Sequence, residues 1–280
     1  MQNHRETLLQ KADRIRQEKI LDDKSIEFYS DLFEFHYSKT SIWMELNAFP
    51  SVDDILNISI ESGLTGIPDI AIEELTKSIA ELGAIIKHSQ GIDTDKAVND
   101  FSAGRSNIEQ TIGFILKKSS DDLVAMSKTA QMDYEKYIFL VVNWLKPFLI
   151  AFRKNSAKMI KDDHGNYREC PFCGYYPDIS LISLEKDGSR YLRCGLCENL
   201  WRYKRIACAV CGNEDAKKLE YFTGENNDRY RLDVCHSCSG YIKTVRLNKT
   251  EDIEHCDLTI ENILSAPLET LLMQKGYMKL

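Results

Sequence analysis

Eight of the nine cysteines in this sequence form four Cys-x-x-Cys pairs within the 69 residues from Cys170 to Cys238. The pairs are Cys170/Cys173, Cys194/Cys197, Cys208/Cys211 and Cys235/Cys238. Two intervening residues allow one tight turn to direct two sulfur atoms at the same tetrahedral ion. Four such turns supply two complete four-sulfur sites with no ligand left over. The pattern therefore predicts two metal ions per chain.

The cysteine pairs belong to an internal repeat. The first pair corresponds to the third with an offset of 38 residues, and the second to the fourth with an offset of 41. Each copy reads as a cysteine turn, a hairpin, a second cysteine turn and a strand, which is the layout of a rubredoxin-like or zinc-ribbon module. Each copy carries four cysteines, which is a full ligand set. We therefore favour sequential pairing, in which the two cysteine pairs of one copy bind the same ion, over the interleaved pairing of cross-braced zinc domains.

Sequential pairing assigns four cysteines to each metal site. The first site is Cys170, Cys173, Cys194 and Cys197, and the second is Cys208, Cys211, Cys235 and Cys238. A four-thiolate site has no open coordination position, so its ion is not expected to act as a Lewis acid on a substrate. Zinc would be structural and would contribute on the order of 10 kcal/mol to folding. Iron would add a one-electron couple, and cysteine spacing does not choose between the two metals.

Residues beside the cysteines are candidates for stabilising the thiolates. Gly174 and Gly212 directly follow their turns, where glycine lets backbone N–H groups point at sulfur. Four basic residues close in sequence could also offset the negative charge: Arg193, Arg202, Lys204 and Arg205. A solvated basic strand face explains each of the four equally well.

The other candidate ligands are weaker. With eight cysteines already sufficient, His164, His236 and His255 are interpreted as surface or linker residues. Cys256 is interpreted as a lone thiol. No Gly-rich phosphate loop, G-x-S-x-G elbow or acid–base constellation appears in the sequence. We therefore predict that the protein is not an enzyme.

The elements that must position the cysteines change in type near residue 160. Before that point, apolar residues recur at three- and four-residue steps, which predicts helices. The clearest helix runs from Asp69 to Gln90 with Gly91 as its C-cap. Another is expected to begin at Asp93–Thr94, and a last long one spans residues 134–160. The polar segment 161–166 is the best domain boundary.

Beyond this boundary the pattern changes to strands and hairpins, and then returns to helical spacing over residues 257–277. The predicted fold class is α+β: an N-terminal all-α helical bundle, two tandem rubredoxin-like (zinc-ribbon-like) β modules and a short C-terminal helix. The expected domains are residues 1–163 (helical), 164–206 (first module), 207–251 (second module) and 252–280 (tail).

Charge and hydropathy indicate which classes of partner and which cellular location to expect for the chain. Net charge is −7, and residues 170–251 carry 13 Lys and Arg against 11 Asp and Glu, or +2, which argues against a dedicated nucleic-acid binder. The most apolar stretch, residues 137–152, is short and contains Pro147, so it predicts a buried, kinked helix and no membrane span. The N-terminus lacks a secretory signal. We therefore expect a cytoplasmic protein, where this cysteine spacing indicates metal rather than disulfides.

Several stretches resemble a known family. They are Cys170-Pro171-Phe172-Cys173-Gly174, Arg190-Tyr191-Leu192-Arg193-Cys194-Gly195-Leu196-Cys197, Cys208-Ala209-Val210-Cys211-Gly212, Cys235-His236-Ser237-Cys238, Tyr241-Ile242-Lys243 and Leu271-Leu272-Met273-Gln274-Lys275-Gly276-Tyr277. Together with the acidic helical half, they resemble the FdhE family of formate dehydrogenase accessory proteins. The resemblance is specific from Cys170 to Lys243 and looser elsewhere.

The resemblance implies a cytoplasmic maturation factor that binds the catalytic, molybdenum-containing subunit of a respiratory formate dehydrogenase during assembly. It implies that the functional positions are the eight paired cysteines, and it favours iron as the metal, with zinc as the alternative. It identifies no partner-contact residue in the helical half.

Two other functions remain as alternatives. A nucleic-acid-binding zinc ribbon is favoured by Trp201-Arg202-Tyr203-Lys204-Arg205, where aromatic and basic residues interleave as in a stacking platform. A strand with alternating faces explains the same residues. A rubredoxin-type electron-transfer or redox-sensing protein would use iron in either four-cysteine site.

Overall fold

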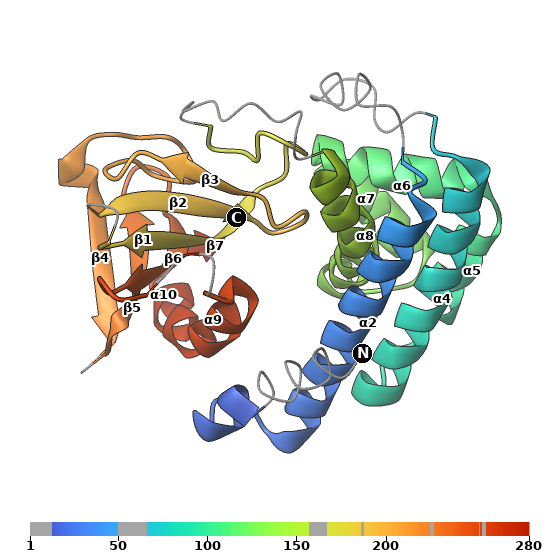
Figure 1. Cartoon of the computed structure of the whole chain (residues 1–280), viewed down its shortest axis with the longest axis horizontal. Coiled ribbons are helices and arrows are strands. Elements are labelled where there is room, and N and C mark those ends of the chain that lie inside the picture. The colour runs from blue at the N-terminus through green and yellow to red at the C-terminus, as the bar shows by residue number, and fades with distance from the viewer. Residues whose placement is uncertain are drawn as a thin grey trace. The chain divides into compact units, whose positions relative to one another are not determined.

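The computed structural model describes residues 13–49, 66–156, 167–185, 188–224, 227–251, 253 and 256–279 (Figure 1). The chain forms two compact units. One comprises Met1–Lys161 with Phe172–Tyr175, and the other comprises Asp162–Pro171 with Tyr176–Leu280. The four-part division expected from the sequence stays a prediction. Each unit is described by itself below.

The first unit is helical. Its described helices are α2 (Asp23–Leu46), α4 (Asp69–Gln90), α5 (Asp95–Ser102), α6 (Arg105–Lys117), α7 (Ser120–Thr129) and α8 (Tyr134–Ser156). Helix α4 has the predicted bounds, and Gly91 ends it with a left-handed φ of 66°. The helix expected from residue 93 onward is two helices, because Gly104 interrupts it with a φ of 138°. Helix α7 is not predicted by the sequence.

Helix α8 packs against α2 and α4 and supplies much of the core of this unit. The rings of Trp43 and Phe148 meet edge to face with their centroids 4.9 Å apart. Trp144 Nε1 donates a hydrogen bond of 2.8 Å to the carbonyl oxygen of Leu75. Pro147 lies inside α8, as predicted. No helix within the described residues has the length and apolar character that crossing a bilayer requires.

The second unit is built on one β-sheet. Its strands are β1 (Pro177–Ser183), β2 (Ser189–Cys194), β3 (Leu200–Tyr203), β4 (Leu219–Gly224), β5 (Asn227–Cys235), β6 (Gly240–Leu247) and β7 (Met278–Lys279). The order is β3-β2-β1-β6-β5-β4, and β7 pairs with β6. Strands β1 to β6 lie in the part of the chain where the sequence predicts strands and hairpins, whereas β7 lies beyond it and is not predicted.

The two sequence repeats share this sheet. Strands β1, β2 and β3 come from the first repeat and pair antiparallel, as do β4, β5 and β6 from the second. The repeats join where β1 pairs with β6 in parallel, with Ser180 opposite Thr244 and Leu181 opposite Val245. The repeats are therefore halves of one continuous sheet.

The C-terminal tail packs on one face of the sheet. It contains α9 (Leu258–Leu264), the 3-10 helix η3 (Ala266–Leu268) and α10 (Glu269–Gln274), drawn in red-brown in Figure 1. Leu272 of α10 packs with Leu232, Val234 and Tyr241 in a buried apolar cluster. The helical spacing predicted for the tail is thus realised as short helices.

Candidate metal centres

The four cysteine pairs lie on tight turns at the ends of strands. The turns that contain Cys170 and Cys208 precede the first strand of their repeats. Cys194 ends β2 and Cys235 ends β5, and each is followed by the turn that carries its partner. Two antiparallel strands therefore deliver two turns to the same end of each hairpin.

The structure brings the eight cysteines together in two groups. One is Cys170, Cys173, Cys194 and Cys197, and the other is Cys208, Cys211, Cys235 and Cys238. Within each group, the sulfur atoms all lie within 4.8 Å of one another. These are the sets that sequential pairing predicts, and the interleaved arrangement is not formed. The role of the cysteines as metal ligands stays a prediction.

The sulfur positions fit a tetrahedral ion. The Cys170 and Cys197 sulfurs are 3.6 Å apart. In the second group, the separations of Cys208 from Cys238 and of Cys211 from Cys235 are both 3.8 Å. Four sulfurs at about 2.3 Å from a metal define a tetrahedron with edges of about 3.8 Å. No disulfide joins the described cysteines, so each group could hold one ion.

Backbone N–H groups point at the sulfur atoms, as the sequence predicts for such turns. The N–H groups of Leu196 and Cys197 both lie 3.4 Å from Cys194 Sγ. The equivalent donors to Cys208 Sγ are Val210, at 3.3 Å, and Cys211, at 3.4 Å. Such donors stabilise the negative charge of four thiolates around a divalent ion.

The residue after each cysteine turn has a left-handed backbone. Gly174 and Gly212 have φ values of 72° and 76°, in agreement with the role predicted for them. Glu198 and Ser239 occupy the same position in the other two turns, with φ values of 57° and 55°. All four turns therefore share one backbone shape, and in two of them a side chain is forced into a region that glycine prefers.

The two groups differ in exposure. All four cysteines of the first group are buried, whereas Cys211 and Cys238 of the second are partly exposed. Burial raises the pKa of the Cys208 thiol to about 12. For Cys235, N–H donation from Ser237 and Cys238 outweighs the effect of burial and lowers the pKa to about 7. The thiol of Cys235 is therefore more readily ionised than that of Cys208.

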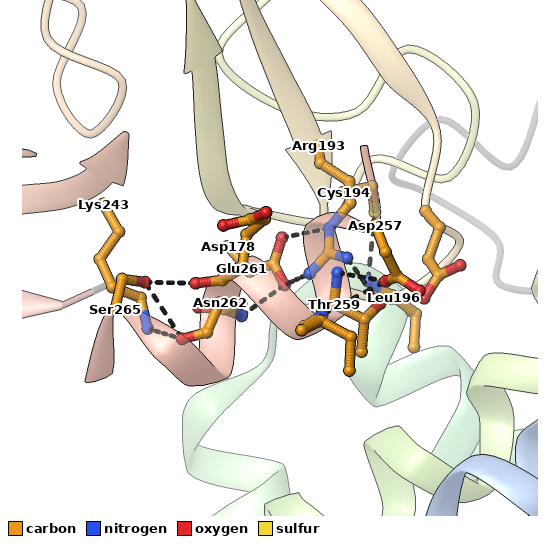
Figure 2. Close-up of polar contacts among 12 residues, drawn as sticks. Asp178, Arg193, Cys194, Leu196, Lys243, Asp257, Thr259, Glu261, Asn262 and Ser265 are labelled. Atoms are coloured by element: carbon orange, nitrogen blue, oxygen red, sulfur yellow. Dashed lines mark hydrogen bonds and ion pairs between the residues drawn. The ribbon is translucent and has the colours of Figure 1, made fainter. Parts of the chain in front are cut away.

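The basic residues near the cysteines make other contacts. Buried Arg193 pairs with Asp178, with Nε 3.0 Å from Oδ1, and its Nη1 donates to Thr259 Oγ1 at 2.8 Å (Figure 2). Lys204 forms an exposed ion pair of 2.6 Å with Glu214. Arg193 therefore joins β2 to the tail helix α9 immediately before Cys194, a role that the sequence does not predict.

A polar network continues from Asp178 along α9. Asn262 Nδ2 donates to Asp178 Oδ2 at 3.1 Å, and the Asn262 carbonyl oxygen accepts from Lys243 Nζ at 2.7 Å (Figure 2). Lys243 also pairs with Glu269 at 3.0 Å. Burial nevertheless lowers the pKa of Lys243 to about 8. The tail is therefore held to both repeats by partly buried polar contacts as well as by apolar packing.

The proposed aromatic stacking platform is not available for bases. Trp201 is buried, and its Nε1 donates to the carbonyl oxygen of Tyr167 at 2.8 Å. Tyr203 is buried as well, and its hydroxyl donates to the carbonyl oxygen of Cys208 at 2.9 Å. Since Arg202 between them is exposed, the alternation reflects the two faces of a strand.

His236 and Cys256 lie outside the two groups. His236 Nε2 is 2.9 Å from a Glu220 oxygen, and its Nδ1 is 3.1 Å from the Tyr277 hydroxyl. Burial raises the pKa of the Cys256 thiol to about 12. His164 and His255 lie outside the described residues.

Several known proteins are similar to this chain in sequence, and one solved structure is similar in fold. A model of the FdhE central domain matches residues 169–205. A protein named FdhE homolog from Aquifex aeolicus is 27% identical over 290 residues, covering 99% of this chain and 94% of that protein. A protein of the same name from Pseudomonas aeruginosa is 34% identical over 118 residues, covering 39% of this chain and 37% of that protein.

One solved structure is similar over nearly the full length. The crystal structure of the FdhE protein from Pseudomonas aeruginosa matches with a TM-score of 0.55 at 18% identity, covering 98% of this chain and 91% of that chain. At this identity the match demonstrates a shared fold.

Proposed function

We propose that this chain, which is similar to an FdhE homolog over nearly its whole length, is a member of the FdhE family: a cytoplasmic accessory protein that binds the catalytic subunit of a formate dehydrogenase during assembly. The observation that carries the proposal is the alignment with an FdhE homolog over 99% of this chain, both units included. The two groups of four cysteines are in keeping with a binding role, because four thiolates around an ion leave no position for a substrate.

The proposed cofactors are two metal ions, held by Cys170, Cys173, Cys194 and Cys197 and by Cys208, Cys211, Cys235 and Cys238. Iron in such a site supplies a one-electron couple, whereas zinc supplies only structure. The chain's contribution is to aim the sulfur atoms and the N–H donors. Elemental analysis and an absorption spectrum of protein purified without oxygen are expected to give two ions per chain and to identify them.

The function is tested with the apo catalytic subunit of a formate dehydrogenase. We expect the purified full chain to bind it in a titration, and we expect deletion of the gene to abolish formate dehydrogenase activity until the wild-type gene is restored. Intact activity in the deletion strain would refute the proposal. A strain expressing the chain with Cys208, Cys211, Cys235 and Cys238 all changed to Ser would report whether the second metal is required.

A second candidate function is favoured by one observation. The partial exposure of Cys211 and Cys238 would bring an ion in the second group close to solvent, as electron exchange with a partner requires. A reversible visible spectrum on iron loading, coupled to a physiological donor, would support electron transfer. An iron-free protein that still restores formate dehydrogenase activity would exclude it.

A further inference from the structure

We propose that a cavity beside the second cysteine group binds an extended segment of a partner protein, by an acidic side chain and the apolar side chain next to it. The cavity has a volume of about 270 Å³, equal to about nine water molecules at roughly 30 Å³ each. It lies wholly within the second unit. This inference rests on the proposed function, because it supplies the surface by which a partner would be held.

The cavity opens on the face of the sheet away from the tail helices. Arg231 and Asp233 of β5 line it, and they alternate with Leu232, which packs under α10. The segment 205–210, which contains Cys208, also lines the cavity. Arg190 fixes this segment by donating from Nη1 to the carbonyl oxygen of Ala207 at 2.8 Å.

Two guanidinium groups in the cavity share one carboxylate. Arg190 is only 3% exposed, and its Nη2 lies 3.2 Å from Asp233 Oδ2. Arg231 Nε lies 2.8 Å from Asp233 Oδ1. The same Oδ2 atom already accepts a hydrogen bond of 2.6 Å from Thr244 Oγ1. Asp233 therefore neutralises one of the two positive charges at most.

Both arginines retain unused hydrogen-bonding capacity. Arg190 Nη2 and Arg231 Nε are buried and make no hydrogen bond with the described residues, although both lie within ion-pair distance of Asp233. A buried donor without an acceptor is unfavourable, because it has lost its hydrogen bonds to water without replacement. A second carboxylate entering the cavity would supply the missing acceptor oxygens and balance the charge.

Arg205 adds a third guanidinium at the rim. It is exposed and forms no ion pair among the described residues. Its guanidinium lies directly over Gly188, where an added Cβ would be 2.7 Å from Nη1. Glu220 also lines the cavity, but it is paired with His236 at 2.9 Å. The lining thus carries three arginines against two carboxylates, which favours an anionic group.

Two exposed apolar side chains also line the cavity. Ile206 is 60% exposed and Tyr221 is 59% exposed. The guanidinium of Arg231 lies over the Tyr221 ring, 4.9 Å from its centroid. Exposed apolar side chains around a charged pocket are typical of protein-binding sites, where an anchor residue enters and its neighbours cover the rim. For this reason the observations favour a protein segment over a small molecule.

The test uses a library of random peptides displayed on phage and selected on the metal-loaded full chain. We expect enrichment of sequences in which Asp or Glu adjoins an aliphatic or aromatic residue. For a selected peptide, Arg205→Glu and Ile206→Asp should each weaken binding about tenfold or more. Asn or Gln in place of the acidic residue of the peptide should have the same effect.

Matched controls are Arg202→Glu, which makes the same charge change outside the cavity, and Ile70→Asp, on an apolar side chain that is 49% exposed in the helical unit. Both should leave affinity within about twofold. Metal content and circular dichroism confirm that each variant is folded. No enrichment of an acidic–apolar motif, or binding that is insensitive to both cavity variants, would overturn the inference.

The two proposals fail in different ways. If the wild-type chain does not bind the catalytic subunit, the proposed function fails, while the peptide selection still tests the cavity. If the subunit binds wild type and the variant Arg205→Glu with Ile206→Asp equally well, the cavity inference fails and the proposed function stands.

Discussion

At the scale of single residues, buried charge is concentrated where the tail meets the sheet. Arg193 is held by Asp178 and Thr259, and Lys243 by Glu269 and the Asn262 carbonyl oxygen. Removing one member of a buried pair leaves the other charge without compensation, which costs far more than losing a surface pair. These side chains should therefore control the stability of the second unit.

Substituting Arg193→Gln should destabilise the second unit by about 3–5 kcal/mol, because the Asp178 side chain, which is only 21% exposed, would lose its cation. The measurement is urea unfolding of the metal-loaded chain. Arg202→Gln is the control, since Arg202 is exposed and should change the unfolding free energy by less than about 0.5 kcal/mol. Equal effects of the two substitutions would show that the network does not stabilise the fold.

The stability of this unit should rise with pH between about 8 and 10.5. The pKa of Lys243 is lowered to about 8 by burial, while its ordinary value is 10.5. In this window the unfolded chain binds a proton that the folded chain has released, so raising the pH favours the folded state by up to about 1.4 kcal/mol per pH unit.

Unfolding free energies measured across this pH range for wild type and for Lys243→Met test the assignment. The rise that belongs to Lys243 should be absent from the variant, and thiolates bound to metal should not titrate in either protein. Parallel pH profiles for the two proteins would assign the effect to another group.

At the scale of elements, periodicity and turn chemistry predict local structure and miss long-range pairing. The bounds of α4 follow from its apolar spacing and from Gly91. Helix α7 is missed because its ten residues bury only Leu123 and Ser127, which leaves a weak apolar pattern. The parallel pairing of β1 with β6 is missed because the local sequence of a strand does not specify which distant strand it pairs with.

In the cysteine turns, too, the sequence predicts some features and misses others. The grouping of the eight cysteines follows from the repeat, and the glycine turns at Gly174 and Gly212 follow from residue type. The left-handed backbones of Glu198 and Ser239 do not follow, because neither residue type indicates that conformation. The network of Arg193 and Asp178 is missed as well, since it depends on how the tail docks.

Glycine substitutions in the turns should separate backbone strain from crowding. Gly174→Ala should cost about 1–2 kcal/mol, from placing a side chain in the left-handed region alone, because an added Cβ meets nothing within 4 Å. Gly212→Ala should cost more, since its Cβ would also lie 2.9 Å from Arg168 Cδ. Urea unfolding of the metal-loaded chains measures both costs, with Ser239→Gly as a control that should not destabilise. A smaller loss for Gly212→Ala would contradict the crowding argument.

At the scale of the whole molecule, the two compact units should unfold separately. A chelator that removes the metal ions should shift the transition of the sheet unit to lower temperature, because seven of the eight paired cysteines belong to this unit and metal binding is coupled to folding. The helical transition should move much less. Scanning calorimetry, with circular dichroism to identify the helical step, makes the comparison. A single transition that shifts as a whole would show that the units do not fold independently.

The parallel pairing of β1 with β6 also determines how fragments of this chain should behave. A fragment that carries either repeat alone would expose the backbone N–H and carbonyl groups along a strand that the intact protein keeps paired. Bare edges of this kind recruit other copies. Each half of the duplication is therefore expected to self-associate when expressed by itself, even if its own four thiols are loaded with metal.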